Sequence, residues 1–131
     1  MAFHHTLPQE AFTDGIPTSW HSQGLRLYGF HGLSHQHVSE TVQAARLISG
    51  HLGAGCCLCA IGNGRSLSTT MGFTPMEGLV MATRSDSVDP GLLLHRLRQG
   101  VTPDQLDQEL NHNSGWLALL NASAPWRPRR E

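Results

Sequence analysis

Apolar residues take up a helical spacing from Ser34 onward. Val38, Val42 and Ala45 recur three or four residues apart, which is the period of a helix with one apolar face. Ser34 suits the N-cap position, because its hydroxyl can accept a hydrogen bond from a free backbone N–H of the first turn. We therefore predict a helix from about His35 to Arg46.

Two apolar or alternating stretches follow, LISGHLGAG and CCLCAIGNGRSLSTT, and glycine interrupts both. Asn63-Gly64 favours a two-residue hairpin turn, because a type I′ turn needs positive φ at both central residues. Cys57–Ile61 and Arg65–Thr70 are therefore expected to pair across this turn. The predicted order in this region is strand, hairpin, strand.

Start and stop signals for a helix enclose residues 90 to 99. Asp89 can cap this helix, Pro90 suits its first position and Gly100 ends it. The helical spacing predicts that three leucines face inward: Leu93, Leu94 and Leu97.

A capping box predicts one more helix. Thr102 can cap it, a proline follows at the first helical position, and Gln105 stands where it can bond back to the backbone of the cap. This helix runs to about Asn111. Residues 1 to 27 show little periodicity and indicate an irregular entry segment or a short helix between turns. Together the elements predict an α/β fold, a mixed sheet with flanking helices.

The composition fits one ordinary domain and excludes several partners. The chain has 131 residues, 39% of them hydrophobic, and a net charge of -1. Acidic and basic residues nearly balance, so we expect no nucleic-acid partner, and the basic ending WRPRRE is interpreted as a solvated terminus. No apolar run approaches the ~20 residues needed to cross a bilayer, and the first residues lack a signal-peptide layout. We expect no membrane association and a cytoplasmic location.

The cysteines gather in CCLC, where an odd number of close neighbours is a poor basis for disulfides. A zinc site is the alternative. Neighbouring residues of a predicted strand point to opposite faces, however, and cannot converge on a tetrahedral ion. We therefore predict no metal site and expect small buried hydrophobic side chains.

Candidate chemistry lies in YGFHGLSHQHV, residues 28 to 38. Glycines on both sides of Phe30 and His31 let the backbone bend closely around a ligand. An imidazole there can donate to an anion or exchange a proton near neutral pH. His37 is interpreted as a surface histidine.

Five separated motifs resemble the acetate kinase family, the acetate and propionate kinases of the sugar kinase, Hsp70 and actin superfamily: AFHHTLP, YGFHGLSH, GHLGAG, STTMGFTPMEGLVMATRS and VDPG. The resemblance covers roughly residues 2 to 119. It implies a partial ribonuclease-H-like (actin-like ATPase) domain, the first part of the second domain of that family, over residues 1 to 119. Residues 120 to 131 are expected to form an irregular tail.

The resemblance also implies roles for individual residues. His31 and Arg84 would stabilise the phosphoryl group in the transition state of its transfer, and Phe30 and His35 would belong to the carboxylate pocket. Asp86, which departs from the family pattern, would pair with Arg84 and weaken its hold on phosphate.

A glycine-rich loop would hold the nucleotide. The resemblance implies that the phosphates of ATP meet five residues: His51, Leu52, Gly53, Ala54 and Gly55. The family usually has asparagine at the position of Ala54, so one side-chain hydrogen bond would be absent and nucleotide binding weaker.

The implied reaction is ATP plus acetate to ADP plus acetyl phosphate. ATP and Mg²⁺ are the implied cofactors, acetate or propionate the carboxylate, and a homodimer the implied assembly. The family's catalytic aspartate and its magnesium ligands match no residue here, since Met1 stands at the position after that aspartate. The chain is therefore expected to be a fragment. The alternative is a truncated non-catalytic remnant or an oligomerisation module.

Overall fold

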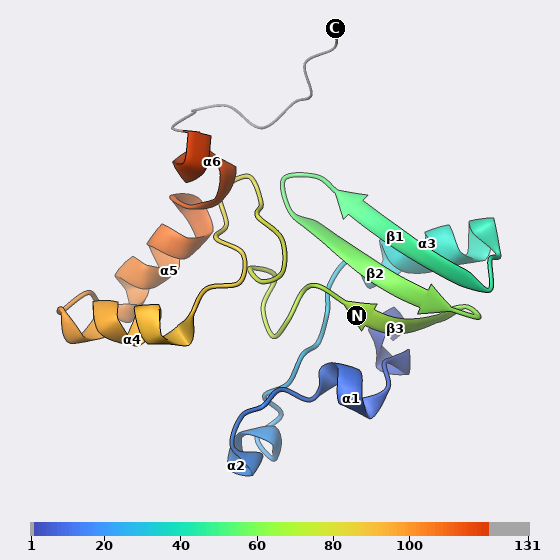
Figure 1. Cartoon of the computed structure of the whole chain (residues 1–131), viewed down its shortest axis with the longest axis horizontal. Coiled ribbons are helices and arrows are strands. Elements are labelled where there is room, and N and C mark those ends of the chain that lie inside the picture. The colour runs from blue at the N-terminus through green and yellow to red at the C-terminus, as the bar shows by residue number, and fades with distance from the viewer. Residues whose placement is uncertain (1, 121–131) are drawn as a thin grey trace, which may run out of the picture.

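A computed structural model describes residues 2–120 of the chain (Figure 1). Short helices come first, a three-stranded sheet follows α3, and three helices close the described part. The elements are η1 (Ala2–Thr6), α1 (Gln9–Phe12), α2 (Thr18–His21), α3 (Gly32–Val42), β1 (Arg46–Leu52), β2 (Cys56–Gly62), β3 (Arg65–Thr69), α4 (Pro90–Arg98), α5 (Pro103–His112) and α6 (Gly115–Leu120).

The strands form one sheet in the order β1-β2-β3, and both pairs run antiparallel. Asn63 and Gly64 have φ values of 48° and 78°, as a type I′ turn requires, and the predicted hairpin is confirmed. The register shifts between Ala60 and Ile61, where one extra residue interrupts the β2–β3 ladder. The predicted α/β class is confirmed, but the strands of the described part pair only antiparallel, whereas we predicted a mixed sheet.

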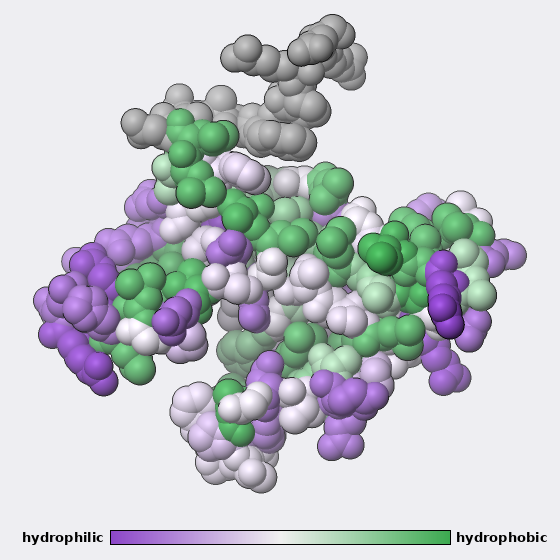
Figure 2. Space-filling model, viewed as in Figure 1, coloured by the Kyte–Doolittle hydropathy of each residue, from purple (hydrophilic) through white to green (hydrophobic). Residues whose placement is uncertain are grey.

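Alternation along the strands gives the sheet one buried and one open face. Ser49 lies opposite Cys59 and His51 opposite Cys57, so these side chains share the face that packs against α3 and η1. Ile48 and Leu52 point the other way and are 75% and 77% exposed. In Figure 1, α3 lies behind β1 and β2, and Figure 2 shows hydrophobic surface over the uncovered face and at α6.

Two small clusters make the apolar core. One joins Phe3 to Cys59 and Ile61, with Leu47 at its edge. The other joins three buried residues, Cys57, Met71 and Met81, to the partly buried Phe30 and Cys56. The second cluster includes Phe30 and therefore supports the segment next to His31.

The helix predicted for residues 35–46 is confirmed, but its limits and its cap were wrong. It spans Gly32–Val42, and its N-cap is His31, whose side chain makes no capping bond. The buried positions of α3 are Gly32, His35 and Ser39 rather than the valines. Polar side chains face inward here because the sheet offers them partners, which apolar periodicity cannot indicate.

Helix α4 begins as predicted. The side chain of Asp89 accepts a bond from the Gly91 backbone N–H at 2.8 Å, and Pro90 is the first helical residue. The prediction that the leucines face inward was wrong for two of them, since Leu94 is 51% and Leu97 39% exposed. Within the described part, nothing covers this side of the helix.

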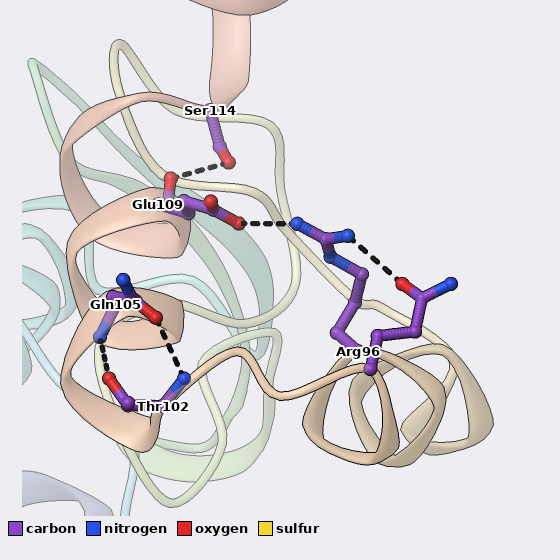
Figure 3. A network of polar contacts seen from close by, with 6 residues as sticks. Arg96, Thr102, Gln105, Glu109 and Ser114 are labelled. Atoms are coloured by element: carbon purple, nitrogen blue, oxygen red, sulfur yellow. Dashed lines mark hydrogen bonds and ion pairs between the residues drawn. The ribbon is translucent and has the colours of Figure 1, made fainter.

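Helix α5 carries the predicted capping box, drawn in Figure 3. The Gln105 backbone N–H donates to Thr102 Oγ1 at 3.2 Å, and the Gln105 side chain accepts from the Thr102 backbone N–H at 2.9 Å. An ion pair of 3.8 Å links Arg96 of α4 to Glu109 of α5. The ion pair is half-exposed, so it contributes little to stability.

The segment before residue 28 forms three short helices separated by turns, in agreement with the prediction of a short helix between turns. The predicted tail falls, apart from residue 120, outside the described residues. Between residues 2 and 120, no helix combines the length and apolar character needed to span a bilayer.

Candidate active site

His31 occupies a strained backbone position at the start of α3. Its φ and ψ are 57° and 23°, the left-handed region, which is uncommon for residues other than glycine, although histidine enters it more often than most. This conformation turns the ring toward β1, where it stacks on His51 with 3.8 Å between ring centroids and 9° between planes. Two of the predicted site residues are therefore in direct contact.

The thiol of Cys57 lies between two histidines. Its Sγ is 3.1 Å from His31 Nδ1 and 3.1 Å from His35 Nε2. Cys57 is fully buried, and burial raises its pKa to about 11. The side chain is therefore a protonated thiol at neutral pH, with one S–H to donate.

His35 lies behind His31 rather than on the surface. Its ring is fully buried, and Nδ1 is 3.0 Å from Ser49 Oγ. Burial, followed by the charges of His4, His31 and His51, lowers its pKa to about 4. His35 is therefore neutral at physiological pH and acts on the site through its contacts.

Arg84 and Gly55 reach the same place from later in the chain. A Cβ built on Gly55 would lie 3.2 Å from Arg84 Nη1 and 3.8 Å from His31 Cε1. The Ala82 backbone N–H also donates to the Ala54 carbonyl oxygen at 3.0 Å, which ties the Arg84 segment to the glycine-rich loop. Residues far apart in sequence thus converge on one surface.

The guanidinium of Arg84 bonds to the Pro75 carbonyl oxygen at 3.3 Å. The expected ion pair between Arg84 and Asp86 is not present. Among residues 2–120, the structure contains one ion pair, between Arg96 and Glu109. The expectation that Asp86 pairs with Arg84 was therefore wrong. The cation keeps its charge available to an anion.

The electrostatics of this surface suit a negatively charged ligand. Burial lowers the pKa of His31, and the nearby charges of His51 and Arg84 act in the same direction. A neutral His31 offers one ring N–H, and Arg84 supplies the positive charge. Oxygen atoms of a phosphate or carboxylate are the natural partners of such a pair.

The glycine-rich loop joins β1 to β2. His51 and Leu52 end β1, and the Gly53 backbone N–H donates to the Gly55 carbonyl oxygen at 3.1 Å. Leu52, Gly53 and Ala54 are exposed, and His51 Nδ1 lies 3.1 Å from Ser34 Oγ. The loop is a tight hairpin connection next to His31.

Both the ring and the backbone carbonyl of Phe30 contact buried residues. Its ring packs, half-buried, on the cluster of Cys57, Met71 and Met81. Its carbonyl oxygen is 2.9 Å from Nε2 of the buried His4. The chain is thus anchored one residue before the strained His31.

Sequence comparison decides the family. A sequence model described as the Acetokinase family matches residues 1–130. The chain belongs to the acetokinase family. The motifs that suggested this resemblance include those that carry His31, the loop of residues 51–55 and Arg84.

Relatives within the acetokinase family are close in sequence and structure. The acetate kinase of Cyanothece sp. (strain PCC 7425 / ATCC 29141) is 51% identical over 96% of this chain and 33% of its own length. The acetate kinase structure from Entamoeba histolytica superposes with a TM-score of 0.87 at 36% identity, over 93% of this chain and 33% of that one. A propionate kinase structure from Francisella tularensis gives 0.84 at 39% identity, over 89% and 33%. The chain spans about a third of the curated relatives it matches.

The cysteines differ in burial, and Cys56 is only partly buried. Cys57 and Cys59 are fully buried, as predicted. Within residues 2–120, no group of three His, Cys, Asp or Glu side chains could hold a metal ion. A separate hollow of about 690 Å³, lined by residues including Phe3, Gln36 and Asn63, contains no predicted site residue.

Sequence reasoning missed three side chains that hold the site together: Cys57, Ser49 and Ser34. Strand alternation could have placed Cys57 and Ser49 on one face, but it could not show that α3 would bring His31 and His35 against it. Ser34, predicted as a cap, instead contacts His51.

Proposed function

We propose that this chain supplies the phosphate-facing wall of an acetate-kinase-type active site, which transfers a phosphoryl group between ATP and the carboxylate of acetate. The observation that carries the proposal is the convergence of His31, Gly55 and Arg84 on one surface. The family, which this chain shares with acetate and propionate kinases, supports a nucleotide and a short-chain carboxylate as ligands.

The transition state of phosphoryl transfer spreads negative charge over the equatorial oxygens of the moving group. In the proposed reaction, Arg84 and the ring N–H of His31 bond to these oxygens. Because both are held before the substrate arrives, they stabilise the charge without reorganising. The N-terminus of α3 directs its positive dipole end to the same side.

The loop of residues 51–55 is proposed to meet the nucleotide phosphates. Gly55 lies so close to Arg84 that a side chain there would push into the space between Arg84 and His31. The backbone can therefore approach a phosphate without obstruction. Ala54 gives this loop no side-chain hydrogen bond, so we expect weaker nucleotide binding than with asparagine.

Phe30 is proposed to line the carboxylate pocket beside His31, and His35 to support the pocket from within. Acetate and propionate both remain candidates for the carboxylate, and the homodimer and a cytoplasmic location also belong to this proposal. ATP is taken to act with Mg²⁺. The described residues offer no cluster that fits that ion, so we assign none of them to it.

A chimera tests this role directly. Residues 2–119 would replace the matching third of the Cyanothece acetate kinase, and acetyl phosphate formation would be measured with acetate and Mg-ATP. We expect turnover, with a loss of about 10²- to 10³-fold in kcat for His31→Ala or Arg84→Ala. His37→Ala is the matched control, because this exposed histidine lies on the same helix. An active chimera unaffected by His31→Ala would refute the proposal.

A second reading concerns the 131 residues by themselves. They contain no match for the aspartate and magnesium ligands that the resemblance assigns, and catalytic groups that act as a unit fail together. We propose that these 131 residues by themselves do not catalyse the transfer. ADP release by the isolated chain that disappears in His31→Ala would contradict this reading.

A further inference from the structure

A line of four polar side chains runs from the interior of the sheet to His31. Ser49 Oγ lies 3.0 Å from His35 Nδ1. His35 Nε2 lies 3.1 Å from Cys57 Sγ, which lies 3.1 Å from His31 Nδ1. Ser49 is 3% exposed, and His35 and Cys57 are fully buried, so water does not compete for these contacts.

Each inner member of this line has one proton to share with its neighbours. Burial keeps His35 neutral, with its pKa near 4, and Cys57 protonated, with its pKa near 11. A neutral imidazole donates from one nitrogen and accepts at the other, and a thiol donates one S–H. The protons can therefore be arranged in one of two directions along the whole line.

Ser49 decides the direction. Within the described residues, its hydroxyl has one hydrogen-bond partner, His35 Nδ1. If Nδ1 carried the proton, the Ser49 hydroxyl would accept that bond and its own proton would be buried without an acceptor. A buried donor left unpaired costs about 1–3 kcal/mol, so the hydroxyl donates to Nδ1.

The rest of the line follows from that first bond. With Nδ1 accepting, His35 donates from Nε2 to the sulfur, and the Cys57 S–H donates to His31 Nδ1. His31 Nδ1 is then bare, and its proton lies on Nε2. His31 Nε2 has no hydrogen-bond partner among residues 2–120. The buried side-chain N or O atom without a partner in this range is Thr69 Oγ1, so His31 Nε2 is not buried and reaches solvent.

We propose that Cys57 is a positioning residue that fixes His31 in the Nε2–H tautomer and presents this N–H to the ligand surface. Stacking on His51 holds the plane of the ring, but it does not distinguish the two nitrogens. The thiol does so, because it offers its proton to one of them. This inference rests on the proposed role of His31, which needs a donor directed at the phosphoryl oxygens.

The test reads the tautomer itself in the full chain. Long-range ¹H–¹⁵N correlation spectra of the ¹⁵N-labelled protein at neutral pH distinguish protonated from bare ring nitrogens. In the wild type we expect His31 as the Nε2–H tautomer. In Cys57→Ala, His31 should populate both tautomers, and Cys57→Ser, which restores an X–H donor, should return it to Nε2–H.

Two further variants separate this effect from general damage. Cys59→Ala is the matched control, because Cys59 is equally buried on the same strand but contacts Ser66 instead of a histidine. It should leave His31 unchanged. Ser49→Ala removes the first donor of the line, three hydrogen bonds from His31, and should also give mixed tautomers. This variant keeps the proposal testable if Cys57→Ala fails to fold.

The outcomes are distinct. Three wild-type results would overturn the inference: a His31 proton on Nδ1, a His31 that exchanges between tautomers, or the spectrum of an unfolded chain. His31 fixed as Nε2–H in both Cys57→Ala and Ser49→Ala would also overturn it. Failure of the proposed function appears elsewhere, as an active chimera that is unaffected by His31→Ala. The tautomer needs no turnover to be observed, so either proposal can fail alone.

Discussion

Gly29, next to the segment that carries His31, is a position where adding one methyl group should destabilise the fold. It is buried, with φ of 70°. A Cβ built on it would lie 2.8 Å from His4 Cδ2 and 2.8 Å from Thr69 Cγ2. Both neighbours are themselves buried, so neither can move aside into solvent.

Two contributions set the magnitude for Gly29→Ala. A left-handed conformation costs an L-residue about 1–2 kcal/mol, and forcing a methyl group into a packed site costs about 1–3 kcal/mol. We therefore expect the free energy of unfolding to fall by about 2–5 kcal/mol. His4 would be displaced from the Phe30 carbonyl oxygen, so the damage would reach the residue before His31.

Urea unfolding followed by circular dichroism measures this change, with an unchanged m-value showing that the two states remain comparable. Gly64→Ala is the matched control. Gly64 has φ of 78°, and a Cβ there meets no atom within 4 Å. This variant should lose about 1–2 kcal/mol from the backbone alone. Equal losses in the two variants would refute the steric part of the argument.

Three further predictions concern pH, capping and the exposed leucines. The pKa of His35 is about 4 in the folded state, below its usual 6.5, so as pH falls the imidazole is protonated first in the unfolded state. The free energy of unfolding should therefore fall as pH drops from 6.5 to 4, and His35→Gln should reduce this pH dependence. A wild-type stability that does not change over this pH range would contradict the prediction. Thr102→Ala should cost about 1 kcal/mol by thermal unfolding, with recovery in Thr102→Ser, since the capping box loses its acceptor; no loss would show that α5 does not depend on its cap. Leu106→Ala should cost about 2–5 kcal/mol in urea, and Leu94→Ala less than about 0.5 kcal/mol, because Leu106 is buried and Leu94 exposed; similar losses would show that α4 buries its leucines after all.

Elements whose geometry is set by neighbouring residues could be predicted from the sequence. The Asn63-Gly64 turn, the Asp89 cap and the Thr102 capping box each depend on residues within four positions of one another. Their structures follow because backbone donors and dihedral angles are satisfied locally. The limits of α3 were missed because its cap is a histidine, which its own side chain gives no reason to expect.

The site was only partly predictable, because its contacts join distant segments. The motif resemblance named His31, Arg84 and the glycine-rich loop, and the structure brings them together. It could not indicate that Cys57 lies between two histidines, or that Asp86 stays apart from Arg84. The prediction that the α4 leucines face inward failed for the same reason. Helical spacing shows which residues share a face, but not whether another element covers that face.

The left-handed backbone at His31 has a consequence for any attempt to engineer this protein. Glycine adopts a φ of 57° without strain, so a screen for heat resistance would tend to favour glycine at this position. That exchange would discard the imidazole and, with it, the contact to the Cys57 thiol. Selection for stability therefore favours glycine at this position, whereas the proposed catalysis requires histidine. Engineering for stability should keep His31 unchanged.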